Sequence, residues 1–112
     1  MAYDIRGLWT GNAKGSIFGA EGSVTIISQQ GEDISGIIEG GNIFGRAKFE
    51  IRGKIQDNYI SGTRDGNTFQ GYLYPDWTIQ GVFKGIDGDT YKVHLRRPYN
   101  YWGLPQEGWP YN

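Results

Sequence analysis

Apolar and polar residues alternate along most of the chain, and this alternation predicts β-strands. The longest run is 43–55, where one set of positions is apolar or glycine and the other is mainly charged. Shorter runs and apolar segments lie at 3–11, 16–20, 23–28, 33–39, 59–64, 68–74, 77–83 and 90–96. Successive side chains of a strand point to opposite faces. One face of each run is therefore expected to be core and the other to face solvent.

Turn-forming residues separate these runs at intervals of about ten residues. Asp65-Gly66 is a strong hairpin signal, and Pro75 forces a reversal because proline cannot donate to a strand ladder. The spacing predicts an all-β fold, a small antiparallel up-and-down meander barrel of about eight strands. Pairing of the first and last strands would remove both sheet edges.

A short phrase recurs through the runs: a large apolar residue, any residue, then glycine. It occurs at Ile5/Gly7, Ile17/Gly19, Ile34/Gly36, Ile43/Gly45, Ile51/Gly53, Ile60/Gly62, Phe69/Gly71, Ile79/Gly81 and Phe83/Gly85. Inward glycine can allow tight coiling, make room for a neighbouring ring, or leave a cavity for a ligand. The many large inward residues favour a filled interior over a cavity.

The C-terminal residues 98–112 differ from the rest of the chain. Alternation stops, and three prolines and five aromatic residues appear. Ordering such a segment costs conformational entropy that only burial of its rings would offset. We therefore expect a barrel over 1–97 and an ordered tail over 98–112, packed on the barrel or on a neighbouring subunit. The tail residues expected to make this contact are Tyr99, Tyr101, Trp102, Trp109 and Tyr111.

Composition narrows the choice of partner and compartment. The 112 residues suit a single domain, and the net charge of −1 comes from 11 basic and 12 acidic residues. This balance predicts no nucleic-acid partner and no membrane partner. There is no cysteine, so neither a disulfide nor a thiolate metal site is expected. The first residues do not resemble an export segment, which predicts a cytoplasmic protein.

Catalytic and metal-binding patterns are weak. His94, the single histidine, lies at an outward position, and a β-turn explains Asp87 and Asp89 better than a calcium loop does. No Gly-x-Ser-x-Gly motif occurs, and the other candidate carboxylates lie in turns. We therefore predict no enzyme activity, no metal and no cofactor.

Two groups of outward residues bear on partners. Arg46, Lys48, Arg52 and Lys54 form a basic stripe beside Phe44, for which a solvated strand face is the simpler explanation. Apolar residues also occur at outward positions: Leu8, Phe18, Ile37, Phe44, Tyr72, Tyr74 and Val82. If these residues cluster, their patch is too large for a lone monomer, which favours a homo-oligomer.

The segment Gly7-Leu8-Trp9-Thr10-Gly11-Asn12, followed by Ser16, resembles the first strand of the avidin and lipocalin (calycin) group of ligand-binding barrels. The resemblance implies that Trp9 closes one barrel end and that the interior carries a small apolar or amphipathic ligand. The chain departs from biotin-binding barrels because its inward positions are almost all apolar. It also lacks the helix that follows the barrel in lipocalins. Only the role of Trp9 is carried over.

The sequence thus predicts a non-enzymatic barrel that binds an apolar or aromatic small molecule. The residues expected at the site are Trp9, Phe49, Phe69, Trp77, Phe83 and Tyr91. The alternative is a structural or protein-interaction barrel with a filled core, which acts through its outer apolar patch and its tail. These hypotheses differ in whether the interior is hollow.

Overall fold

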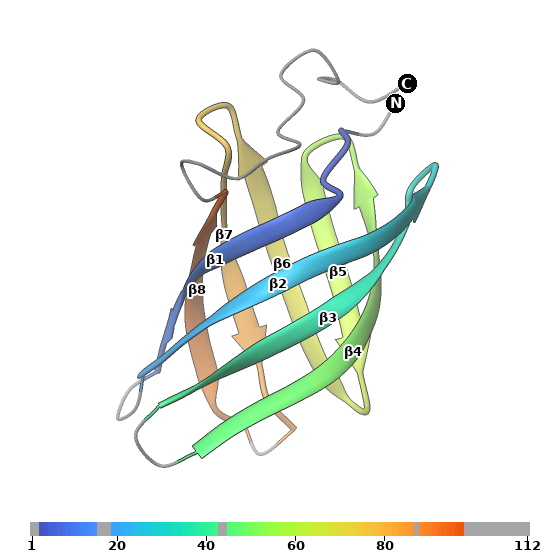
Figure 1. The fold of residues 1–112 in the computed structure, drawn as a ribbon. Helices are drawn as coiled ribbons and strands as arrows, with labels where there is room; N and C mark the ends of the chain where they lie inside the picture. The colour runs from blue at the N-terminus through green and yellow to red at the C-terminus, as the bar shows by residue number, and fades with distance from the viewer. Residues whose placement is uncertain (1–2, 16–18, 43–44, 87, 98–112) are drawn as a thin grey trace.

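The structure is a computed structural model that describes residues 3–15, 19–42, 45–86 and 88–97, with the backbone alone at 42, 45, 46 and 49. Eight strands follow one another around a closed barrel (Figure 1). They are β1 (Gly7–Lys14), β2 (Gly19–Gln30), β3 (Asp33–Asn42), β4 (Gly45–Gln56), β5 (Tyr59–Arg64), β6 (Asn67–Tyr74), β7 (Thr78–Lys84) and β8 (Thr90–Arg96). No helix long and apolar enough to cross a membrane occurs in these ranges.

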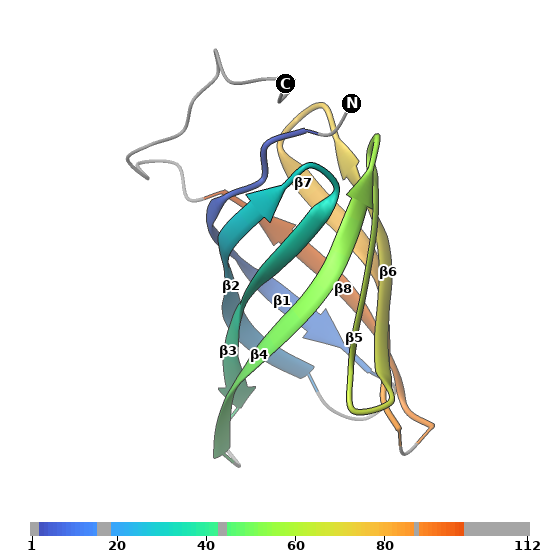
Figure 2. The ribbon, with the colours of Figure 1, turned by 90° about the vertical axis from the view of Figure 1, so that its right-hand side faces the viewer.

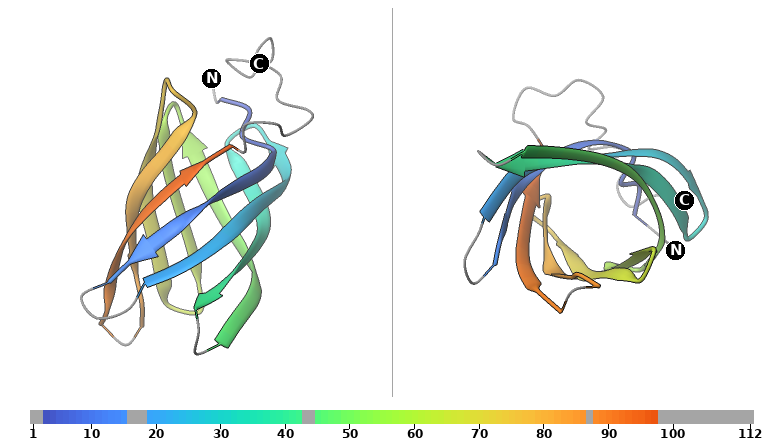
Figure 3. Two further views of the ribbon diagram at one scale, coloured as in Figure 1. Left: turned by 60° about the vertical axis from the view of Figure 1, so that its left-hand side comes forward. Right: turned by 90° about the horizontal axis from the view of Figure 1, so that it is seen from below.

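Every sequential pair of strands is antiparallel, and β1 pairs with β8 to close the barrel. The predicted up-and-down meander is therefore confirmed. Asp65 and Gly66 both have positive φ, 48° and 87°, as a tight hairpin turn between β5 and β6 requires. Seen end-on, β1–β4 form one half of the wall and β5–β8 the other (Figure 3). Strand β4 extends past the shorter β5–β6 hairpin (Figure 2).

The N-terminal run and the second run differ from the sequence prediction. Strand β1 begins at Gly7, whose φ is 113°, and residues 3–6 leave the sheet. The segments 16–20 and 23–28 were predicted to be separate, whereas one strand, β2, covers 19–30 with a bulge between Ile26 and Ser28. Because the bulge shifts the phase of the strand, Gln29 is buried instead of lying in a hairpin loop.

Inward glycines let adjacent strands approach closely. A Cβ atom added at Gly36 would overlap the Thr25 carbonyl of β2, and one added at Gly81 would overlap the Gln70 carbonyl of β6. Backbone also blocks a Cβ at Gly11, Gly22 and Gly53. A neighbouring ring is an additional obstacle at Gly71, where Phe69 lies nearby. Among the described glycines, tight coiling is thus the main reason for the repeated phrase.

The packed core occupies one half of the barrel. Its buried apolar residues are Ile5, Trp9, Ile26, Ile34, Ile55, Ile60, Leu73 and Ile79. They lie toward the end where residues 3–6, the β2–β3 turn and the β4–β5 turn meet, which we call the closed end. Inward residues toward the opposite end, such as Phe83, Tyr91 and Val93, remain only half-buried. We call that end the mouth.

Candidate functional site

Trp9 forms the floor of the barrel interior at the closed end. Its side chain is fully buried, and Nε1 donates a hydrogen bond to the carbonyl oxygen of Ile5 at 2.9 Å. The Arg97 guanidinium lies 4.6 Å from the centre of the Trp9 ring and 4.7 Å from that of Trp77. Cation–π contact with two rings stabilises this buried charge. Trp77 reaches it from the β6–β7 turn with φ of 62°, instead of from the strand predicted at 77–83.

Residues 3–6 cross the closed end and are held there by polar contacts. The Gln29 amide accepts a hydrogen bond from the Ile5 N–H at 3.0 Å and donates one to the Tyr3 carbonyl at 2.7 Å. Arg97 Nη2 donates to the Asp4 carbonyl at 3.2 Å. These bonds satisfy backbone groups that leave the sheet, so the segment is a fixed cover and not a fraying terminus.

Asp4 is buried within this cover, although alternation placed it on the outward face. Its carboxylate accepts two hydrogen bonds from the Arg6 guanidinium, at 2.9 and 2.7 Å. These bonds, together with one from the Arg6 N–H, hold the pKa of Asp4 below its ordinary value of 3.8 despite desolvation. The misplacement has a simple cause: strand alternation does not apply to 3–6, because those residues are not in a strand.

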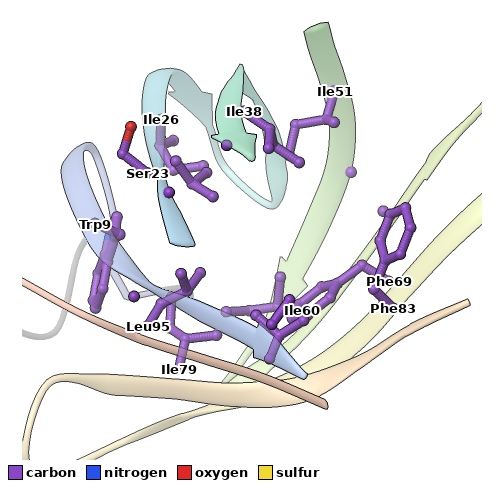
Figure 4. Close-up of a pocket in the computed structure, with 18 of the residues that line it drawn as sticks. Trp9, Ser23, Ile26, Ile38, Ile51, Ile60, Phe69, Ile79, Phe83 and Leu95 are labelled. Carbon is purple, nitrogen blue, oxygen red and sulfur yellow. The ribbon is translucent and has the colours of Figure 1, made fainter. Parts of the chain in front are cut away.

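A cavity of about 340 Å³ lies inside the barrel, lined from Ile5 and Trp9 at the closed end to Phe83 and Tyr91 toward the mouth. Ile26, Ile38 and Ile51 face Ile60, Ile79 and Leu95 across it, with Trp9 toward one side (Figure 4). The cavity is partly open to solvent. The interior lined by the described residues therefore contains a cavity, whereas the large inward residues had favoured a filled barrel.

Aromatic side chains form one wall of the cavity toward the mouth. Phe69 of β6 and Phe83 of β7 are cross-strand partners, and both point into the cavity (Figure 4). The Tyr91 ring of β8 lies 6.4 Å from Phe83, with the two planes tilted by 53°. This tilted arrangement is favourable for aromatic pairs and presents apolar ring surface to whatever enters.

Polar side chains fasten the rim next to this wall. Arg64 Nη1 donates to the Glu50 carbonyl at 2.7 Å, and Arg64 Nε lies 3.5 Å from Asp65 Oδ2. The Asn67 side chain donates to the Arg64 carbonyl at 3.0 Å and accepts from the Ile86 N–H at 2.8 Å. The β5–β6 and β7–β8 turns are thereby tied together, which gives the mouth a defined shape.

The lining offers little for acid–base or metal chemistry. Glu21 and Glu39 border the cavity from exposed outward positions, and Glu39 forms an ion pair with Lys48 at 3.7 Å. His94 is exposed on the outside of β8. Within the described ranges, no group of three His, Cys, Asp or Glu side chains could hold a metal ion. The cavity can instead shield the apolar surface of a small molecule from water.

The structure brings together most, but not all, of the predicted site residues. Trp9, Phe69, Phe83 and Tyr91 line the cavity, whereas Trp77 packs behind Trp9 at the closed end. Phe49 pairs with Ile38 through its backbone, and its side chain is not described. The tail residues Tyr99, Tyr101, Trp102, Trp109 and Tyr111 lie outside the described ranges.

Sequence reasoning missed the aliphatic lining and the polar groups of the closed end. Arg97 could have been found, because it continues the inward phase of Val93 and Leu95. Gln29 could not, because the bulge that turns it inward has no clear sequence signal.

The outward residues singled out in the sequence lie on different parts of the surface. Leu8 on β1 and Ile37 on β3 are half-buried, whereas Tyr72, Tyr74 and Val82 are exposed on β6 and β7. Phe18 and Phe44 are outside the described residues. In the basic stripe, Lys48 and Lys54 pair with Glu39 and Asp33, each at 3.7 Å, as expected of a solvated face. The described apolar residues do not form one patch.

No protein-family model matches the sequence, and no curated protein matches it. Several solved structures share the fold. A redesigned β-barrel, mFAP1, bound to DFHBI, is 11% identical with a TM-score of 0.72, over 83% of this chain and 94% of that one. The barrel EF1p2_mFAP2b, also bound to DFHBI, is 11% identical with a TM-score of 0.68, over 84% and 94%.

A de novo designed fluorescence-activating β-barrel is 24% identical with a TM-score of 0.60, over 84% of this chain and 94% of that one. At these identities the likeness is one of fold. The chain thus has the fold of small antiparallel barrels, some of which bind a small molecule. The resemblance to avidins and lipocalins is supported at the level of the barrel and no further.

Proposed function

We propose that this protein is a non-enzymatic binding protein that holds an apolar or aromatic small molecule in the barrel cavity. The observation that carries the proposal is the cavity itself, about 340 Å³, whose lining includes core side chains such as Trp9, Ile26 and Ile60. Unfilled apolar space weakens a fold because the lining residues lose dispersion contacts. A bound ligand would restore those contacts.

The dimensions and chemistry of the cavity limit the ligand. Its volume is near the lower end of the range for small-molecule pockets, about 300–1,000 Å³. The wall is aliphatic around Ile38 and Ile51 and aromatic at Phe69, Phe83 and Tyr91. A compact, uncharged molecule with one or two rings satisfies both conditions. A charged group would lose its hydration at this wall without a partner in return.

The comparison structures support a binding role and supply a first probe. The barrels mFAP1 and EF1p2_mFAP2b were solved bound to DFHBI. We therefore expect DFHBI in its neutral, protonated form, or a small aromatic hydrocarbon such as naphthalene, to bind in one-to-one ratio to the whole chain.

Substitution inside and outside the barrel tests the location of the ligand. Val93 of β8 lines the cavity, and Val82 of the neighbouring strand β7 is exposed. Val93→Trp should fill the cavity and weaken binding at least about tenfold, a change of about 1.4 kcal/mol. Val82→Trp should leave the affinity unchanged. Fluorescence or calorimetric titration with both probes measures the effect, and equal loss or equal retention in the two variants would argue against a cavity site.

Assembly and location complete the proposal. We keep the homo-oligomer and the cytoplasmic compartment as parts of it on the sequence alone, which has apolar residues at outward positions and first residues unlike an export segment. Light scattering on the whole chain would measure its mass in solution, and a monomeric mass would contradict the homo-oligomer.

A further inference from the structure

Carboxylates are placed differently in the two halves of the barrel wall: within the strands in one half, and in the turns in the other. Strands β5–β8 contain no aspartate or glutamate. The strand carboxylates lie instead on β2–β4, at Glu21, Asp33, Glu39 and Glu50. Strands β5–β8 are flanked by aspartates in their turns, among them Asp57, Asp65, Asp76 and Asp89, so this half is close to neutral as a whole and its cations stand without carboxylates only along the strands.

The half without strand carboxylates carries cations that have no ion-pair partner in the described structure. Lys84 of β7 and both Lys92 and Arg96 of β8 are exposed, and no Asp or Glu side chain of the described residues lies within ion-pair distance of them. Lys14 of β1 is the cross-strand neighbour of Lys92. The lysines of β4 differ, because Lys48 and Lys54 are both paired.

Tyrosines lie on the same outer surface, on β5 and β6, separated from the cations of β8 by β7. Tyr72 and Tyr74 of β6 are 47% and 40% exposed, so their ring faces are accessible to a partner. Tyr59 of β5 supports Tyr72 from the side, with ring centres 5.3 Å apart and planes tilted by 58°. We call Tyr59, Tyr72, Tyr74, Lys84, Lys92 and Arg96 the tyrosine–lysine face.

The strand register sets the distance between rings and charges. Tyr74 pairs with Thr78, which pairs with Arg96, and Gln70 pairs with Val82, which pairs with Lys92. A column of tyrosines on β6 therefore runs alongside a column of cations on β8, two strand spacings or about 10 Å away. The nearest carboxylates are at strand ends, where Asp76 accepts a hydrogen bond from the Thr78 hydroxyl at 2.7 Å.

We propose that the tyrosine–lysine face binds single-stranded nucleic acid. Flat rings next to a line of cations match a strand whose bases stack while its phosphates track the positive groups. Neutral side chains such as Gln80 and Val82 separate the two columns. This surface is outside the barrel, so the proposal stands independently of the cavity ligand.

The test uses the whole chain and a fluorescein-labelled 15-nucleotide oligothymidine, followed by fluorescence anisotropy. With three phosphate contacts, the slope of log K against log salt should be near −2, so affinity should fall about fifteenfold between 50 and 200 mM salt. Lys92→Gln combined with Arg96→Gln removes two phosphate contacts, so the slope should become shallower by about 1.4. The matched pair Lys48→Gln with Lys54→Gln, on the opposite half, should leave it unchanged.

A second pair of variants separates stacking from charge. Tyr72→Leu should weaken binding at least about fivefold, whereas Tyr72→Phe should keep it, because the ring supplies the stacking. Thermal unfolding followed by circular dichroism confirms that each variant is folded. DFHBI titration of the same variants should be unaffected, which keeps failure here distinct from failure of the cavity proposal.

Several results would overturn the proposal. Absence of binding at 50 mM salt would do so directly. If heparin, duplex DNA of the same length or phosphatidylglycerol vesicles displaced the labelled oligothymidine as well as unlabelled oligothymidine does, the face would be a general anion-binding surface without stacking. An unchanged affinity in Tyr72→Leu would exclude the tyrosines as the platform.

Discussion

At Gly53, a single hydrogen atom in place of a side chain lets β4 and β5 come together. A Cβ atom there would overlap the Ser61 carbonyl, whereas a Cβ at its cross-strand partner Gly62 would approach the Arg52 carbonyl at 3.3 Å. Two glycines of one pair therefore contribute differently. The difference comes from the local coiling of the strands, which two identical Ile-x-Gly phrases cannot reveal.

This pair makes a direct prediction. Gly53→Ala should lower the free energy of unfolding by about 2 kcal/mol or more, because the backbone of β5 must move away. Gly62→Ala should lower the free energy of unfolding clearly less, since the Arg52 carbonyl needs to shift by only a few tenths of an ångström. Urea denaturation of both variants measures the difference, and equal midpoints would contradict the role of close strand approach.

Among the elements, the cover formed by residues 3–6 departs most from its sequence pattern. Alternation extends the first strand to Tyr3, whereas the structure ends the sheet at Gly7 and turns the chain across the barrel. Gln29 and Arg97, from distant parts of the chain, hold it there. Local periodicity therefore located the strand but not its end, because the end depends on long-range hydrogen bonds.

The cover should make stability depend on pH. The folded-state pKa of Asp4 is below its ordinary value of 3.8, so the ionised carboxylate stabilises the fold above that pH. This stabilisation is lost as pH falls through the lowered pKa. Urea unfolding of wild type and Asp4→Asn should show a stability difference at pH 7 that shrinks toward pH 2.

The exposed Asp57, at the β4–β5 turn, provides the control for this prediction. Asparagine tolerates its φ of 53°, so Asp57→Asn should cost little at either pH. A stability difference for Asp4→Asn that is the same at both pH values would show that the loss is one of packing and not of charge.

For the molecule as a whole, the buried core and the cavity share one interior. Ile55 and Leu73 lie behind the cavity at the closed end and contribute to the apolar burial that stabilises the fold. Trp9 and Ile60 belong to the same core and also line the cavity, which continues toward Phe83 and is available for a ligand.

Ligand binding should therefore raise the stability of the entire domain. At a concentration one hundred times its dissociation constant, a cavity ligand should add about 2.7 kcal/mol to the free energy of unfolding. The measurement is the urea midpoint with and without DFHBI. At the same concentration Val93→Trp, whose site is at least about tenfold weaker, should gain about 1.4 kcal/mol or less, and an increase equal to that of the wild type would place the ligand outside the barrel.

Local signals in the sequence are enough for the all-β class, the meander order and the inward phase of the strands, because alternation and turn residues act over short distances. The same signals identify Trp9, Phe69, Phe83 and Tyr91 as inward-facing. Three features emerge only in the folded barrel: the interior contains a cavity, residues 3–6 cover the closed end, and strand carboxylates are confined to neighbouring strands β2–β4. These features depend on strand coiling, the β2 bulge and register around a closed sheet, which arise from contacts between residues far apart in the chain.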